Sequence, residues 1–149
     1  MIVAAVLKEK GSEVVTVTSA TSVTDIARVI ASRKIGAVVV CDDDRLAGIV
    51  SERDVVKAIS AQGEAALRLT ASDIMTKDVT TATLLTTIDE AMAMMNAGYF
   101  RHLPVVENGK IVGIISVRDV VRTHIQIKAQ EVDSLKAYVF RGAQADGLR

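Results

Sequence analysis

Several residue types that define common functional classes are scarce in this chain. Its 149 residues include one cysteine, one proline, no tryptophan, two tyrosines and two phenylalanines. A single cysteine excludes an intrachain disulfide and any zinc site built from several cysteines of one chain. Half of the residues are hydrophobic, so the length allows a full core of one domain or two very small ones. Because aromatic residues are few, that core must be aliphatic.

Positive and negative residues are equal in number, so the net charge does not identify the chain as a binder of polyanions. Lys and Arg number 18, as do Asp and Glu, which argues against a broad basic face for nucleic acid or for an anionic membrane. A local cluster of positive charge is still compatible with this balance. No apolar stretch approaches the roughly 18 residues of a membrane span. The apolar start, residues 1–7, lacks a basic leader and runs into Lys8, so no signal peptide is predicted. We therefore expect a soluble, cytoplasmic protein.

Residues with reactive or metal-binding side chains do not form a recognisable catalytic set. Cys41 ends the apolar run 37–41, which favours a buried, inert thiol over a reactive one. The acidic run 42–44 favours a solvated turn over a cation site, because the spacing of an EF-hand is absent. His102 and His124 are the two histidines, and the chain has no nucleophile elbow and no Walker loop. We therefore expect neither enzymatic activity nor a bound metal.

The chain contains two copies of one unit, 65 residues apart. Residues 48–56 match residues 113–121, with seven of nine positions identical. The same offset aligns Thr16 with Thr81 and Thr18 with Thr83, and no gap is needed from about residue 15 to about residue 122. Repetition on this scale indicates duplication of a structural unit.

Each copy predicts the element order βαββα. In the first copy we expect strands at 14–17, 37–41 and 46–50, a helix capped by Thr21 or Ser22, and a helix beginning at Ser51. In the second copy the corresponding elements are strands at 79–82, 103–106 and 111–115, a helix at 87–96, and a helix from Ser116. The fold class is therefore α/β, or more loosely α+β.

The repeats also define a domain plan. It comprises an N-terminal lead-in at 1–10, repeat 1 at 11–59, a connection at 60–75, repeat 2 at 76–124, and a C-terminal helix and tail at 125–149. Apolar residues at helical spacing predict one long helix from Val117 to about Phe140, and residues 141–149 are expected to fray. That helix is either a dimer contact or a cover on the core of the repeats.

The closing segment of each copy carries a family resemblance. Residues 48–54 and 113–119 both contain Gly, two apolar residues, Ser, two variable residues and Asp, which resembles the closing signature of the cystathionine-β-synthase (CBS) domain family. Residues 100–106 resemble the family's central strand motif. The resemblance covers about residues 11–124. It implies a tandem pair, or Bateman module, with pseudo-twofold symmetry and two clefts that bind AMP, ADP, ATP or related adenosyl compounds. It also implies a homodimer.

The two helix starts allow a structural and a functional interpretation. Ser51 with Asp54, and Ser116 with Asp119, have the spacing of a capping box, which satisfies free amides at a helix start. A helix N-terminus is also a natural phosphate site. The resemblance assigns the two aspartates to the ribose hydroxyls and the two serines to phosphate. Capping and ligand binding are compatible with each other.

The first strand of each repeat carries a pair of threonines. The resemblance implies that backbone groups near Thr16, Thr18, Thr81 and Thr83 meet the adenine edge. The alternative is that these residues reflect β-propensity alone.

Basic residues predict two unequal clefts. Arg101 and His102 interrupt an apolar strand entrance, so they either mark an exposed strand start or point into a cleft and neutralise phosphate. The first repeat has Gly36 and Ala37 at the equivalent positions. We therefore expect the second repeat's cleft to be the better nucleotide site.

A further arginine pair occurs at equivalent positions of the two helix starts. Arg53 and Arg118 either contact phosphate or lie solvated on their helices. The candidate nucleotide-binding residues are thus Thr16, Thr18, Gly36, Ala37, Ser51, Arg53, Asp54, Thr81, Thr83, Arg101, His102, Pro104, Ser116, Arg118 and Asp119.

The expected function is adenine-nucleotide sensing by a regulatory protein. The ligand would be AMP, ADP or ATP, with NAD(H) or S-adenosylmethionine as alternatives, and a regulated protein is a possible partner. The competing hypothesis is a structural dimerisation module without ligand.

Overall fold

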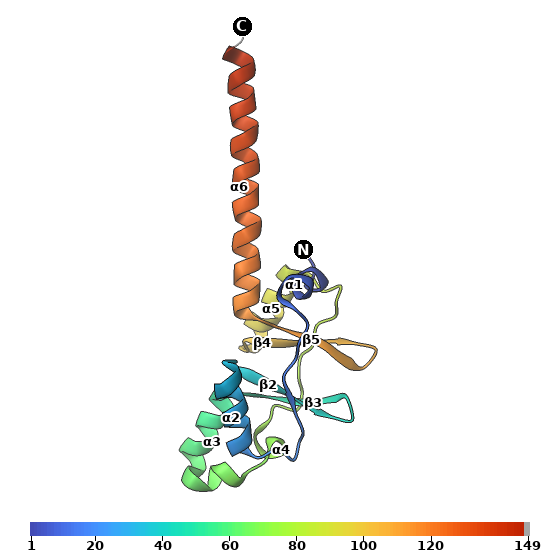
Figure 1. Cartoon of the computed structure of the whole chain (residues 1–149), viewed down its shortest axis with the longest axis vertical. Helices are drawn as coiled ribbons and strands as arrows, with labels where there is room; N and C mark the ends of the chain where they lie inside the picture. Colours follow the sequence, from blue (N-terminus) through green and yellow to red (C-terminus); the bar gives the residue numbers. More distant parts are fainter. Residues whose placement is uncertain (148–149) are drawn as a thin grey trace.

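The computed structural model describes residues 1–147 and shows two repeats side by side with one long helix leaving them (Figure 1). Repeat 1 contains β1 (Thr16–Val17), α2 (Val23–Arg33), β2 (Ala37–Asp42), β3 (Arg45–Ser51) and α3 (Glu52–Gln62). Repeat 2 contains α5 (Ile88–Gly98), β4 (His102–Glu107), β5 (Lys110–Ser116) and α6 (Val117–Gly147). Helix α1 (Val3–Lys10) precedes repeat 1, and the 3₁₀ helix η1 (Gly63–Arg68) and α4 (Ala71–Ile74) connect the repeats.

The strands form one sheet whose two halves are related by the sequence repeat. The strand order is β1-β2-β3-β5-β4, and the halves join through the pair Arg45 and Lys110. These two residues are equivalent in the repeat, so the junction lies on the pseudo-twofold axis. The parallel pairing of Val17 with Val40 recurs as an isolated bridge between Ala82 and Val105. The predicted βαββα repeats and mixed fold class are therefore confirmed, although the strand expected at 79–82 is reduced to that bridge.

Each repeat has its own hydrophobic core. In repeat 1 the central strands β2 and β3 contribute Val38, Val40 and Val50, which pack against Val23 and Ile26 of α2. The continuous apolar run in β2 is buried on both faces, as a central strand between two layers requires. Repeat 2 repeats the arrangement, with Leu103, Val105, Ile115, Ile88 and Ala91.

The two helices that lie outside the repeats are exchanged between the cores. Helix α1, which precedes repeat 1, buries Val3, Val6 and Leu7 in the core of repeat 2. Helix α4, which precedes repeat 2, buries Ala71 in the core of repeat 1. The segments at 1–10 and 60–75 are thus not passive connections, because each contributes a helix that completes the core of the more distant repeat.

Helix α6 is longer than the repeat needs. Val120 and Thr123 near its start are buried, whereas every residue from Lys128 to Ala143 is exposed. Figure 1 shows this part extending away from the body, so it does not cover the core. The fraying expected from residue 141 is wrong for 141–147, which remain helical, and residues 148–149 lie outside the described residues. None of the described helices combines the length and apolar character needed to cross a membrane.

Candidate functional site

The two helix starts predicted to bind nucleotide both form capping boxes. At the start of α3, the Asp54 amide donates to Ser51 Oγ (3.3 Å), and Asp54 Oδ2 accepts from the Ser51 amide (2.8 Å) and hydroxyl (3.0 Å). At the start of α6, the Asp119 amide donates to Ser116 Oγ (3.2 Å), and the Ser116 amide donates to Asp119 Oδ2 (2.9 Å). The capping interpretation is therefore confirmed in both repeats, and it uses one carboxylate oxygen of each aspartate.

The two aspartates differ in the further hydrogen-bond and ion-pair partners of their carboxylate oxygens. Lys10 Nζ, at the end of α1, donates to Asp119 Oδ2 at 2.6 Å and also to the Ile114 carbonyl at 2.8 Å. Arg122 Nη2 donates to Asp119 Oδ1 at 3.2 Å. Asp119 is 7% exposed and both of its oxygens are engaged. Within residues 1–147, Asp54 Oδ1 has no such partner, so the open carboxylate edge belongs to repeat 1 and not to repeat 2.

The ion pair also sets the ionisation of Asp119. Burial alone raises the pKa of this carboxyl, but the hydrogen bonds and charge of Lys10 and the Ser116 amide outweigh it, so the pKa lies below its ordinary value. Asp119 is therefore a carboxylate near neutral pH and ties α1 to α6.

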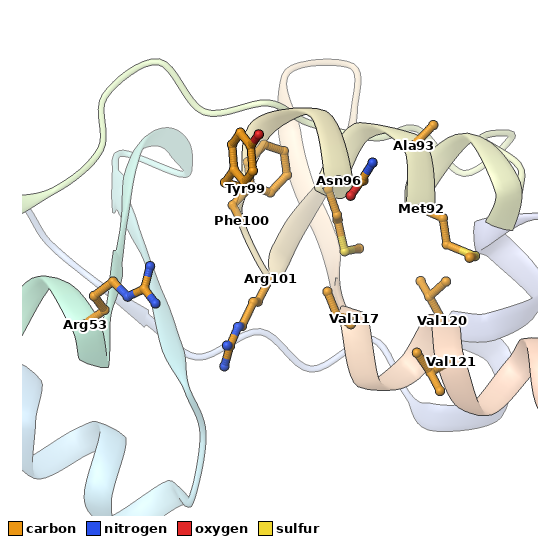
Figure 2. A pocket seen from close by; sticks show the side chains of 11 residues that line it. Arg53, Met92, Ala93, Asn96, Tyr99, Phe100, Arg101, Val117, Val120 and Val121 are labelled. Atoms are coloured by element: carbon orange, nitrogen blue, oxygen red, sulfur yellow. The ribbon is translucent and has the colours of Figure 1, made fainter.

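A cavity of about 680 Å³ lies between the tip of α3 and the helices of repeat 2. Arg53 of α3 and Arg101, just before β4, contribute the charged part of its wall. Figure 2 shows these two side chains extending from opposite sides, one from each repeat. The remaining wall is largely apolar and includes Met92, Met95, Phe100, Val117, Val120 and Val121. The arrangement suits a ligand with an anionic end and a flat or apolar end.

Beside this cavity, four residues form what we call the inter-repeat seam: Gly36, Glu52, Arg101 and His102. A Cβ atom at Gly36 would lie 3.1 Å from His102 Cε1 and 3.6 Å from Glu52 Oε1, so the imidazole covers the glycine backbone. The small residue at 36 therefore makes room for the histidine contributed by the other repeat.

The environment of His102 favours the neutral imidazole. Burial is the largest cause that lowers its pKa, and the charges of Lys10 and Arg101 act in the same direction. Glu52 and Asp119 oppose them, but the pKa still lies below its ordinary value. The protonated form is thus disfavoured in the folded chain.

Acidification from pH 7.5 to 5.5 should destabilise the protein through His102. In the unfolded chain histidine titrates near pH ~6.5, so below that pH the unfolded state takes up a proton more readily than the folded state. Stability is then complete above the unfolded pKa and is lost as the pH falls toward the lower folded pKa. Urea unfolding at both pH values should show a smaller loss for His102→Gln than for the wild type. His124→Gln is the control outside the seam, and equal losses in the wild type and His102→Gln would contradict the assignment.

The sequence matches the CBS domain family over residues 8–61 and 71–125. The chain belongs to the CBS domain family. The crystal structure of the CBS-domain containing protein ATU1752 from Agrobacterium tumefaciens is 45% identical with a TM-score of 0.81, and the match covers 83% of this chain and 99% of that one. The CBS domain pair of MJ0100, solved with 5′-methylthioadenosine and S-adenosyl-L-methionine, is 25% identical with a TM-score of 0.75, covering 83% of this chain and 95% of that one.

A curated CBS relative is longer than this chain. The mitochondrial CBS domain-containing protein CBSX3 of Arabidopsis thaliana is 32% identical over 126 residues. The match covers 81% of this chain and 61% of the relative. The chain thus spans about three fifths of the length of that relative.

The structure brings together only part of the residue set predicted for the CBS clefts. Arg53 and Arg101 share the cavity, and Gly36 and His102 meet at the seam. Arg118, the repeat equivalent of Arg53, is exposed and does not line the cavity. Asp54 instead lines a separate hollow of about 480 Å³ together with Lys57, Asp73 and others.

The predicted threonines serve turns and strands. The amides of Thr18 and Thr83 donate to Thr21 Oγ1 (3.1 Å) and Thr86 Oγ1 (2.9 Å), which fixes the same turn in both repeats. Thr16 lies in β1 and Thr81 immediately precedes the bridge at Ala82. Ala37 and Pro104 are buried in β2 and β4.

Sequence reasoning missed several residues of the site. Lys10 and Glu52 carry no motif of their own, and their importance follows only from the packing of α1 and the seam. Met92 and Met95 lie at helical spacing, a pattern that is equally typical of an ordinary core. Phe100 belongs to the segment that resembles the central strand motif, but that resemblance implies no role for its side chain.

The acidic turn at 42–44 takes part in a hydrogen bond of the fold, and Cys41 is partly shielded from solvent. Asp42 Oδ1 accepts from the Ser19 amide at 3.1 Å, and the equivalent Glu107 Oε1 accepts from the Leu84 amide at 3.1 Å. Cys41 is partly buried rather than fully buried, and burial, with Asp44 and Asp42 nearby, raises the pKa of its thiol. Among the described residues, no group of three His, Cys, Asp or Glu side chains is placed to hold a metal ion.

Proposed function

We propose that this CBS pair is a regulatory, non-catalytic protein that binds an adenine nucleotide of the AMP, ADP or ATP type. The observation that supports the proposal best is the cavity shared by Arg53 and Arg101, because these arginines come from different repeats. Guanidinium groups donate bidentate hydrogen bonds to phosphate. A phosphate between them would receive two such donors. The adenosyl ligands in MJ0100 support a ligand of the same class.

The rest of the cavity suits an adenine base. Its volume of about 680 Å³ falls within the ordinary range for small-molecule sites. Met92, Met95 and Phe100 offer apolar surface and sulfur atoms to a flat aromatic ring. We assign the ribose role to Asp54 only for a second ligand in its own hollow, where Oδ1 is open and Lys57 is nearby. Asp119 is assigned to positioning α1 through Lys10.

A ligand held by both repeats gives a direct route to regulation. Its phosphate would contact Arg53 of repeat 1 and Arg101 of repeat 2, so the ligand binds best when the repeats are in one relative orientation. Occupancy would then select that orientation and the surface it presents to a regulated protein. We place this function in the cytoplasm. The single free cysteine is compatible with that location, because disulfides are rare in cytosolic proteins.

Replacing either cavity arginine should weaken nucleotide binding by about tenfold or more, because each loses a charged hydrogen bond worth roughly 1.5–3 kcal/mol. The measurement is calorimetric titration of the wild type, Arg53→Ala and Arg101→Ala with AMP, ADP, ATP, NADH and S-adenosylmethionine. Arg118→Ala is the matched control, since it removes the repeat equivalent of Arg53 from an exposed position.

Titration with these five compounds also distinguishes between the alternative ligands and the ligand-free module. Binding of NADH or S-adenosylmethionine in preference to the nucleotides would replace the ligand named here by a larger adenosyl compound. Absence of binding across the panel would favour the ligand-free dimerisation module. An equal loss in Arg118→Ala would show that general positive charge, and not the cavity, attracts the ligand.

A further inference from the structure

The outer half of α6 carries apolar side chains that no other part of residues 1–147 covers. Val132, Leu135 and Val139 are 50%, 64% and 61% exposed. This segment extends alone from the body in Figure 1, and it lies beyond the match to the CBS family, which ends at residue 125. Most helical stability in proteins comes from packing of an apolar face, so an exposed apolar face on a long helix indicates a partner.

Five of the exposed apolar residues of α6 follow a heptad, whereas Val117, Tyr138 and Phe140 lie outside it. We call the following residues the α6 stripe: Val121, Ile125, Lys128, Val132, Leu135 and Val139. Their spacing alternates between four and three residues, which keeps them on one side of a supercoiled helix. Ile125, Val132 and Val139 occupy the a positions, whereas Leu135 occupies a d position. Among parallel coiled coils, β-branched residues at a with Leu at d favour two strands, and Val121 and Lys128 occupy the other d positions.

We propose that α6 pairs with α6 of a second copy of this chain as a parallel, in-register coiled coil along the α6 stripe. The charges that flank the stripe match this partner. Glu131 is at a g position and Lys136 is at the following e position. In a parallel pair, g of one helix faces the next e of the other, so Glu131 meets Lys136 twice. An antiparallel pair would not bring these opposite charges together in this way.

The polar member of the stripe is compatible with the same pairing. Lys128 occupies a d position, but Glu131 Oε2 lies 3.4 Å from its Nζ within the same helix. Its flexible stem can cover the apolar stripe while the ammonium reaches solvent. A lysine in the interface weakens the coil and at the same time disfavours other registers, in which it would be buried against an apolar residue.

The coil would begin beside the proposed ligand cavity. Val121 belongs both to the α6 stripe and to the cavity wall, and Val117 one turn earlier also lines that wall. Both side chains are partly exposed in the single chain, at 46% and 38%. Pairing of α6 would therefore place the two cavities of the dimer near the base of the coil. The pairing itself does not depend on the ligand proposed above.

Site-directed cross-linking tests the partner and the register. In a full-length Cys41→Ser background, Val132→Cys places a thiol within the stripe, and Ala137→Cys places one at the f position on the opposite side. Mild oxidation should convert Val132→Cys mainly to a covalent dimer and leave Ala137→Cys mainly monomeric on non-reducing gels. Equal cross-linking of both variants, or of neither, would overturn the proposal, as would a monomeric wild type in sedimentation at micromolar concentration.

A charge exchange tests the parallel register without removing apolar residues. Glu131→Lys and Lys136→Glu should each weaken self-association by about tenfold, because each places like charges across the interface. Mixing the two variants should restore association as a heterodimer, which sedimentation or fluorescence energy transfer would detect. A mixture that associates no better than the separate variants would exclude the parallel, in-register pair.

Discussion

Asp119→Ala should lower the free energy of unfolding by about 3 kcal/mol. The substitution removes the carboxylate half of the α6 capping box, which accepts from the Ser116 amide at 2.9 Å, and it also leaves Lys10 without its carboxylate partner at 2.6 Å. Lys10 is held at the end of α1, whose apolar face completes the core of repeat 2, so the loss should loosen that helix as well. Urea unfolding at pH 7, followed by circular dichroism, measures the change.

Asp54→Ala is the control supplied by the repeat. Asp54 forms the same capping box but has no lysine partner, so losing its bonds to the Ser51 amide and hydroxyl should cost about 1 kcal/mol. A cycle with Lys10→Met isolates the ion pair, because the Asp119 substitution should cost less once the ammonium is absent. Equal losses for the two aspartates would mean that the Lys10 contact contributes nothing to stability.

This difference affects how binding experiments on CBS pairs of this kind are interpreted. An Asp119 variant that fails to bind nucleotide has also lost an anchor of α1, so reduced binding would not identify a ligand contact. Arg53 and Arg101 make no ion pair among the described residues. Substituting them therefore separates binding from folding more cleanly.

The elements within each repeat could be predicted because their signals are local. The apolar run at 37–41 and the segment at 46–50 became β2 and β3 within one residue at each end. Ser22 and Ser51 cap helices as expected, since a hydroxyl before an apolar periodic segment satisfies amides only a few residues away. The repeat offset then transferred these assignments to the second half.

Contacts between distant segments could not be predicted in the same way. Lys10 and Asp119 are 109 residues apart, and nothing in the sequence of α1 indicates which repeat it completes. The sequence of residues 1–10 predicts no more than a lead-in, because a short apolar segment followed by charges is compatible with many structures. The exchange of α1 and α4 between the cores is a property of the folded chain.

The difficulty of predicting contacts between distant segments also explains why the different roles of Arg53 and Arg118 could not be predicted. Arg53 and Arg118 are equivalent by sequence, but Arg53 lies beside residues of the opposite repeat, whereas Arg118 is exposed. Arg53 faces a cavity bounded by Phe100 and Arg101, whose repeat equivalents are Ile35 and Gly36. A repeat in sequence predicts equivalent backbones, whereas the chemistry of a cleft depends on the residues that differ between the copies.

Gly48→Ala should also lower the free energy of unfolding by about 3 kcal/mol, at the upper end of the cost of overpacking. A Cβ atom at this position would lie 2.6 Å from Met75 Sδ and 2.7 Å from the Thr76 carbonyl oxygen. Thr76 cannot easily retreat, because its amide and carbonyl are both hydrogen-bonded to Ile49, at 3.0 and 3.1 Å. Relief of the clash would require breaking this pairing, which attaches the segment after α4 to β3.

Gly113, the repeat equivalent of Gly48, provides a comparison in which a smaller effect is expected. For a Cβ atom at Gly113, the three nearest atoms would all belong to the Leu7 side chain, the closest at 2.6 Å. A leucine side chain can change rotamer, so Gly113→Ala should cost about 1 kcal/mol. Urea unfolding of both variants under one condition tests the ranking, and a loss for Gly113→Ala as large as that for Gly48→Ala would contradict it. The expected order follows from what the exchanged segment presents to each strand: a fixed backbone carbonyl at β3 and a movable side chain at β5.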